Sequence, residues 1–282
     1  MSVFSTNLVN TYTKSVQGLQ KQIATVKAEL ASGKNTLTPA QESSVATLSS
    51  TVKSYSTPQT SIEAAQKTIG IAQTAIKSIL PLINQMQQLA QQASNPGVGS
   101  SDSANFDFRF RQILVEVGKL AVSASLNGNN LLSGSAGMNV VTGIDKSASS
   151  RFFINSVDIY AMMNLGILSG VKLYTPTDAQ AAIGALNSAR AQITNGQFNL
   201  NMTANTLTAK AKKLTDSSAA TQQSINAIQD IDPAKLKTQL TRLQNQKDID
   251  YQLIQQLDPA AYNTLKVAEL TSLAKASVKA IV

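Results

Sequence analysis

Residues 9–30, VNTYTKSVQGLQKQIATVKAEL, decide the fold at the N-terminal end of this chain. Apolar residues recur every seven positions there, and a second set follows three positions later: Val9, Val16, Ile23 and Leu30, then Tyr12, Leu19 and Val26. Such an a/d heptad repeat is typical of a helix that packs along one narrow seam against another helix. We therefore expect a long helix from about Asn7 to Ala31 with a coiled-coil face.

Four further stretches show the same spacing, and the last of them lies near the C-terminus. Their seams are Ile62, Ile69, Ile76, Ile83 and Ala90; Phe106, Ile113 and Leu120 with Phe110, Val117 and Ala124; Leu186, Ile193, Leu200, Leu207, Leu214 and Ile228; and the weaker Leu236, Leu240, Leu243, Ile254 and Leu257. The spacing predicts a mainly α fold, an elongated antiparallel coiled-coil rod whose two terminal helices pair. We expect the two ends to be the working parts.

Glycine and proline positions predict where the helices end. Gly33 caps the first helix, a polar connector covers 34–43, and breaks follow at Pro58 and at 95–97. Pro81 is expected to kink or end its helix because it lacks a backbone donor and clashes with the preceding turn. A long helix is expected from Pro176 to about Asp230, and the final helix is expected to follow Pro233 with an interruption at 258–259.

The middle of the chain has a different residue pattern from the heptad repeats. After a helix over 104–126 and a turn at Asn127-Gly128, short β-type runs appear at 138–141, 152–157 and 171–174. They predict a small β-hairpin region. The expected domains are an N-terminal core helix with its hinge (1–44), the N-terminal part of the rod (45–130), the hairpin region (131–175), the C-terminal part of the rod (176–231) and a C-terminal core helix (232–282).

The composition argues against an enzyme. The chain has no Cys and no His, which removes thiol nucleophiles, imidazole bases, thiolate metal sites and the commonest metal ligand. The 16 acidic residues form no motif that pairs two of them in a pocket. We expect no catalytic, cofactor-binding or metal site.

The net charge of +8 raises the question of nucleic acid, but the cations are scattered, and the densest run, 209–213, lies beside a heptad seam. A solvated helix face explains it, so we expect no nucleic-acid partner. No apolar segment is long enough to span a bilayer, so membrane insertion is not expected either. Residues 1–10 have neither a basic nor an apolar region of a Sec signal.

Several local strings, in order along nearly the whole chain, resemble bacterial flagellin in the style of short alphaproteobacterial flagellins. They are ELASGKN at 29–35, IAQTA at 71–75, LAQQASN at 89–95, LNGNNLLSG at 126–134 and IDPA at 231–234 with the Leu- and Gln-rich helix after it. The departures are PAQES at 39–43, in place of an Asp-rich stretch, and a C-terminus that continues past the family's usual end.

The resemblance implies a structural subunit of the flagellar filament, exported unfolded without a Sec signal and assembled outside the cell into a helical tube for motility. Its partners would be many copies of itself, an export chaperone and the filament cap. The residues expected at the subunit interface are the terminal seams: Val9, Tyr12, Val16, Leu19, Ile23, Val26, Leu30, Leu236, Leu240, Leu243, Ile254 and Leu257. The alternatives are a hook-filament junction protein and a type III secreted coiled-coil effector.

Overall fold

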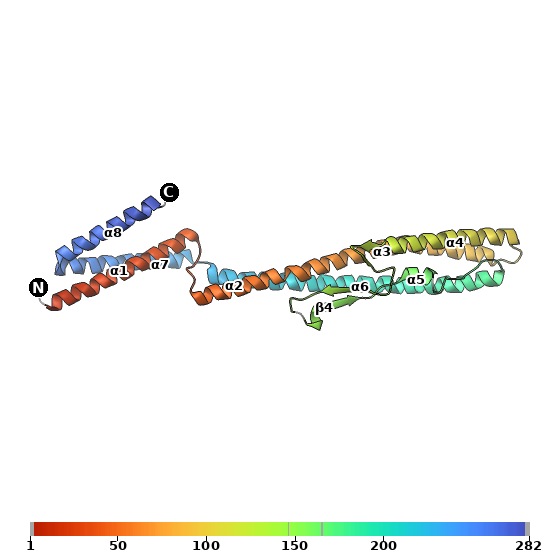
Figure 1. Cartoon of the computed structure of the whole chain (residues 1–282), viewed down its shortest axis with the longest axis horizontal. Coiled ribbons are helices and arrows are strands. Elements are labelled where there is room, and N and C mark those ends of the chain that lie inside the picture. The colour runs from red at the N-terminus through yellow and green to blue at the C-terminus, as the bar shows by residue number, and fades with distance from the viewer. Residues whose placement is uncertain (1–2, 146, 165, 280–282) are drawn as a thin grey trace. The chain divides into compact units, whose positions relative to one another are not determined.

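The computed structural model describes residues 3–145, 147–164 and 166–279, and the chain divides into two compact units. Unit 1 combines both ends, Met1–Leu48 and Gln223–Val282, and unit 2 is Ser49–Gln222. The helices are α1 (Val3–Ser32), α2 (Pro39–Ser54), α3 (Ser56–Ala93), α4 (Ser100–Ser123), α5 (Ile159–Asn164), α6 (Pro176–Gln229), α7 (Pro233–Leu257) and α8 (Pro259–Lys279), drawn in Figure 1. The predicted mainly α class is confirmed, and the five-part domain division stays a prediction.

Unit 2 is built on the predicted middle seams. The second seam is buried along α3, from Ile62 through Ile83 to Ala90, and it packs in one apolar core with Leu186, Ile193, Leu200 and Leu207 of α6 and with Phe110 and Val117 of α4. Burying these aliphatic side chains removes their surface from water at about 25 cal/mol per Å². The heptad periodicity therefore identified the core-facing residues of all three helices.

A ladder of amide and hydroxyl groups accompanies the apolar core between α3 and α6. Each step on α3 rises by seven or fourteen residues while its partner on α6 falls by the same amount, so the helices run antiparallel. The pairs are Gln66 Nε2 to Thr208 Oγ1 at 3.0 Å, Gln73 Nε2 to Asn201 Oδ1 at 2.6 Å and Gln87 Nε2 to Asn187 Oδ1 at 2.8 Å. Because a shift by one turn would break every pair, the ladder specifies the register.

Two small antiparallel hairpins lie in unit 2. Strands β1 (Ser125–Leu126) and β2 (Asn129–Asn130) join at Asn127 and Gly128, whose φ angles of 51° and 80° give the tight turn that Asn-Gly favours. Strands β3 (Met138–Val141) and β4 (Arg151–Ile154) pair from Met138 opposite Ile154 to Val141 opposite Arg151. The predicted hairpin region is confirmed.

The structure corrects the prediction of a strand at 171–174. This segment is a loop whose Leu173 is buried and donates its amide to Asp107 Oδ1 at 3.0 Å. A short helix, α5, instead lies in a segment for which no helix was expected. Six residues with buried Ile159 and Met163 are too few to reveal a helical period in the sequence.

Proline and connector positions needed correction as well. Helix α3 continues through the exposed Pro81, because buried Ile79 and Ile83 anchor it on both sides and their burial outweighs a loss of about 3 kcal/mol. The expected break at Pro58 is only a step between α2 and α3, and Pro58 lies in the first turn of α3, where no amide donor is needed. The connector after α1 ends at Thr38, earlier than predicted, and α2 begins at Pro39.

Gly196 of α6 lies directly against the side chain of Val157. A Cβ at this position would overlap both Cγ atoms of Val157, whereas a Cβ at Gly184 of the same helix would meet nothing within 4 Å. We expect Gly196→Ala to destabilise unit 2 by about 1–3 kcal/mol through overpacking, despite its better helix propensity. The matched control Gly184→Ala should raise stability by up to about 1 kcal/mol. Chemical denaturation of both variants checks this, and equal shifts would contradict it.

Candidate functional site: the paired terminal helices

The two terminal seams bury each other within one chain. Six of the twelve residues expected at a subunit interface are buried, and the other six are half-buried: Val9, Val16, Ile23, Val26, Leu243 and Ile254, then Tyr12, Leu19, Leu30, Leu236, Leu240 and Leu257. Helices α1 and α7 thus pair as predicted, with Ile23 near Leu243 and Val16 near Ile254. The half-buried residues keep apolar surface that one partner helix leaves uncovered. Their role between copies stays a prediction.

Capping and hydrogen-bonding residues define one end of the α1–α7 pair. Asp232 caps α7 by accepting hydrogen bonds at Oδ1 from the amides of Ala234 and Lys235, both at 3.1 Å, and Pro233 occupies the first turn. At the same end the chain after α1 is held to the last turn of α6 by Asn35, whose amide donates to the Gln229 carbonyl at 2.7 Å. The expected seam residue Ile228 is only half-buried, and Ile225, one turn earlier, is buried instead.

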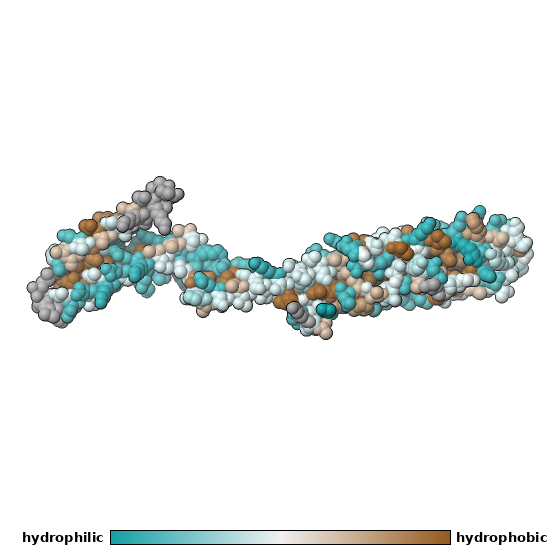
Figure 2. Space-filling view, in the orientation of Figure 1, coloured by the Kyte–Doolittle hydropathy of each residue, from teal (hydrophilic) through white to brown (hydrophobic). Residues whose placement is uncertain are grey.

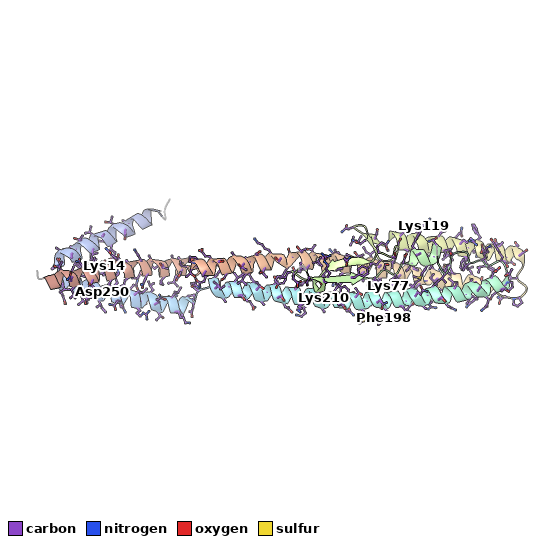
Figure 3. All side chains as sticks on the ribbon, turned by 60° about the horizontal axis from the view of Figure 1, so that its bottom comes forward. Lys14, Lys77, Lys119, Phe198, Lys210 and Asp250 are labelled. Atoms are coloured by element: carbon purple, nitrogen blue, oxygen red, sulfur yellow. The ribbon has the colours of Figure 1, made fainter. Side chains whose placement is uncertain are left out.

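Polar residues occupy the part of α7 where the apolar repeat is interrupted. Asp250 is 2% exposed and accepts hydrogen bonds from Ser15 Oγ at 2.6 Å and from Gln246 Nε2 at 2.9 Å. It lies opposite the part of α1 that carries Lys14 (Figure 3). Tyr251 is 3% exposed, and its hydroxyl accepts a hydrogen bond from Gln20 Nε2 at 3.0 Å. These contacts join α1 to α7 where the aliphatic repeat is interrupted.

Helix α8 turns back after Asp258 and packs on the same end of unit 1 (Figure 1). Its Ala261, Tyr262 and Leu265 contact the cluster formed by Val16, Tyr251 and Ile254. The rings of Tyr251 and Tyr262 meet edge to face with centroids 5.8 Å apart. The apolar end of the α1–α7 pair is therefore covered by the chain's own last described helix.

Glu269 of α8 anchors this arrangement electrostatically. Its Oε1 lies 2.6 Å from Lys247 Nζ, and its Oε2 accepts a hydrogen bond from the Tyr251 hydroxyl at 3.1 Å. Lys266 Nζ lies 3.5 Å from Oε2 and 4.3 Å from the centroid of the Tyr251 ring. The Lys247 and Glu269 side chains are each 16% exposed, so solvent screens their attraction less than at the surface. We call Lys247, Tyr251, Lys266 and Glu269 the α8 clasp.

The clasp shifts the ionisation of two of its members. Burial raises the pKa of Glu269, but the hydrogen bonds from Lys247 and Tyr251 and both lysine charges outweigh it, so the pKa lies below its ordinary 4.5. Burial, followed by the bond to the Glu269 carboxylate, raises the pKa of Tyr251 far above 10.0. Tyr251 is thus a neutral donor and Glu269 a charged acceptor at neutral pH.

The sequence pattern did not reveal the clasp. Lys247 and Tyr251 lie in the stretch where the seam of α7 skips from Leu243 to Ile254, and Lys266 and Glu269 lie in α8. A polar interruption in a heptad repeat indicates a weaker seam when the sequence is considered alone. A buried polar residue at a core position can instead fix register, as Asp250 and Tyr251 do here. Within the described ranges, no three acidic residues gather as a metal site would require, and no helix there is long and apolar enough to cross a membrane.

Family comparisons match both ends of the chain. The bacterial flagellin N-terminal helical region matches residues 4–137, and the bacterial flagellin C-terminal helical region matches residues 183–266. The chain belongs to the flagellin family. The second match covers α7 and the first part of α8, so the clasp lies largely within the family's C-terminal region. The alphaproteobacterial style of the resemblance stays a prediction.

Known flagellins are distant relatives of this family member. The flagellar filament 31.3 kDa core protein of Treponema maltophilum is 27% identical over 174 residues, which are 57% of this chain and 61% of that protein. A flagellin of Halalkalibacterium halodurans is 25% identical over 169 residues, 60% of this chain and 61% of its own length. The match thus spans less than two thirds of either relative.

A solved structure named as a flagellar hook-associated protein from Vibrio parahaemolyticus has a TM-score of 0.57 at 12% identity, covering 67% of this chain and 98% of that one. At such low identity the likeness concerns the fold alone.

Two isoleucines of α7 lie on different faces of the helix, one on the seam and one on the solvent face. Ile254 is fully buried, and Ile249 is 50% exposed. We expect Ile254→Ala to destabilise the α1–α7 pair by about 2–5 kcal/mol through a cavity. The control Ile249→Ala should change stability by no more than about 0.5 kcal/mol. Hydrogen exchange of α1 and α7 amides in both variants checks this, and similar losses of protection in the two would contradict it.

The lowered pKa of Glu269 sets a direction for acid sensitivity. A depressed carboxylate pKa contributes stability above its ordinary 4.5, and this contribution is lost as the pH falls through the folded value below 4.5. We expect the tyrosine near-ultraviolet circular dichroism, unmasked because the chain has no Trp, to lose the Tyr251–Tyr262 signal in that acid window. Glu269→Gln is the control and should lack this transition. A transition of equal size in the variant would refute the assignment.

Proposed function

We propose that this chain is a structural subunit of the bacterial flagellar filament, which assembles through its terminal helices into a helical tube that serves motility. The observation that carries the proposal is the antiparallel pairing of α1 with α7, because both lie in the regions matched by the flagellin family. The relatives named above include a filament core protein, which supports the same role. A structural role requires no catalytic site.

The terminal pair leaves apolar surface that neighbouring copies can cover. Leu19, Leu236 and Leu240 are only half-buried by the partner helix, and Val267 and Leu270 of α8 are 63% and 65% exposed. Figure 2 shows hydrophobic residues at the surface of this end of the chain. Two or three helices with narrow seams gain little stability alone, since most helix stability in proteins comes from packing. A helical lattice of identical copies supplies the missing contacts, as heterologous interfaces do.

The same proposal gives the partners and the place of action. The main partner is a homopolymer of this chain outside the cell, and a flagellar export chaperone and the filament cap complete the set. A chain without cysteine suits passage in an unfolded state, because it has nothing to crosslink on the way. The likeness to a hook-associated protein concerns the fold alone and does not favour the junction role, and no contact described above favours a secreted effector.

Assembly of the purified chain tests the proposal. Addition of a precipitating salt or of short filament seeds should give long uniform tubes in negative-stain electron microscopy. Soluble chains, or short caps that never elongate, would contradict a filament role and favour a junction protein or effector.

Leu240 and Thr241 of α7 offer a matched pair for this test. Leu240 is half-buried on the seam, and Thr241 is exposed beside it. We expect Leu240→Asn to abolish elongation because it places an amide where apolar cover is needed, and Thr241→Asn to elongate like the parent. Far-ultraviolet circular dichroism verifies that both remain helical. Tubes from Leu240→Asn at the parental rate would exclude this part of the seam from the subunit interface.

A further inference from the structure

Helix α8 is attached to α7 and α1 by contacts that are chemically specific. The patch on α7 and α1 offers a cation at Lys247, a phenol donor at Tyr251 and an apolar floor of Val16 and Ile254. Helix α8 offers the complement, a carboxylate at Glu269 and the apolar Tyr262 and Leu265. Helix α8 occupies this patch, with its carboxylate on the cation and the phenol and its apolar side chains on the floor.

A single residue, Asp258, connects α7 to α8. Asp258 is extended, with φ −154° and ψ 93°, and it serves both neighbours. Its amide donates to Ile254 at the end of α7 at 2.7 Å, and its Oδ1 accepts from the amides of Ala260 and Ala261, which begin α8, both at 3.1 Å. The amide of Asp258 belongs to the end of α7, and its side chain belongs to the start of α8. Each helix can therefore keep its cap when a rotation at Asp258 changes the angle between the two helices.

Lys247 and Glu269 lie 22 residues apart with Asp258 midway, so the clasp closes a hairpin of two equal arms. A second copy of the chain presents the same patch and the same arm. Exchange of α8 between two copies keeps every contact of the clasp and changes only the connectivity, as in domain swapping, which a short hinge favours.

Helix α8 also has a second apolar face that the hairpin does not use. Val267 and Leu270 are more than 60% exposed, whereas Leu265 of the same helix is packed on the Tyr251 cluster. A helix with apolar residues on two sides is suited to lie between two surfaces. The described residues of one chain supply only one of those surfaces.

We propose that the patch formed by Val16, Lys247, Tyr251 and Ile254 is a docking site for α8 of a second copy, and that α8 passes from its own chain to the neighbouring chain when copies assemble. The inference rests on the proposed filament function. In the free chain the local concentration of α8 is highest at its own patch, so the hairpin closes on itself. A lattice brings patches of other copies near α8, and a head-to-tail exchange that does not close on itself continues along the polymer.

The absence of cysteine allows a direct test by cross-linking. The double variant Lys247→Cys with Glu269→Cys, treated with a short bis-maleimide, reports where α8 lies. In the free chain we expect an intramolecular product, because Tyr262 and Leu265 still seat α8. The control Lys235→Cys with Glu269→Cys should give none in the free chain, since Lys235 lies in the first turn of α7, far from the clasp.

Tubes grown from parental seeds decide between the two connectivities. Exchange predicts that the intramolecular product of the double variant is lost in tubes and replaced by a ladder of covalently joined chains. Mixed tubes of the two single variants should then give covalent dimers and no longer products, because each chain carries one thiol. Tubes in which the intramolecular product persists at its free-chain yield would overturn the exchange and leave the filament role intact. A chain that forms no tubes at all while its free form cross-links internally would overturn the filament role itself.

Discussion

Antiparallel pairing of early helices with late ones is the constraint on which both units depend. In unit 1 the seam of α1 is covered by α7, and in unit 2 the seam of α3 is covered by α6. Neither member of a pair can bury its narrow apolar stripe alone, so neither is stable without a partner far away in the sequence. The first and last parts of the chain consequently fold together, and the hairpins and α5 are accommodated between α4 and α6 along the chain.

Polar contacts specify the register of the paired helices, which the aliphatic seams alone do not fix. A stripe of Ile, Leu and Val residues tolerates a shift by one heptad, since the same residue types recur. The Gln66, Gln73 and Gln87 ladder excludes a shift by one turn in unit 2, because each amide would then lose its present partner on α6. The buried Asp250 does the same in unit 1, where a slipped register would leave its carboxylate without Ser15. Stability and register thus come from different residues on the same helices.

Proline has opposite consequences in different places. Pro233 and Pro259 stand at helix starts, where the missing amide donor matters little, and each follows an aspartate that caps the helix. Pro81 lies inside α3 and does not end it, since buried residues on both sides hold the helix to the core. At Asp258 the backbone is extended and the chain turns, which places α8 against α7 and creates the α8 clasp.

The sequence by itself determined the long helices, their core faces and the pairing of the chain's ends, because a seven-residue apolar period has one physical interpretation over long stretches. It also determined the Asn127-Gly128 turn, since few residues accept two positive φ angles in succession. Only the tertiary structure decided that α3 continues through Pro81, that residues 171–174 form a loop, and that Tyr251 and Glu269 join three helices. These outcomes depend on contacts between residues distant in sequence, such as Gln20 with Tyr251, and no local pattern records them.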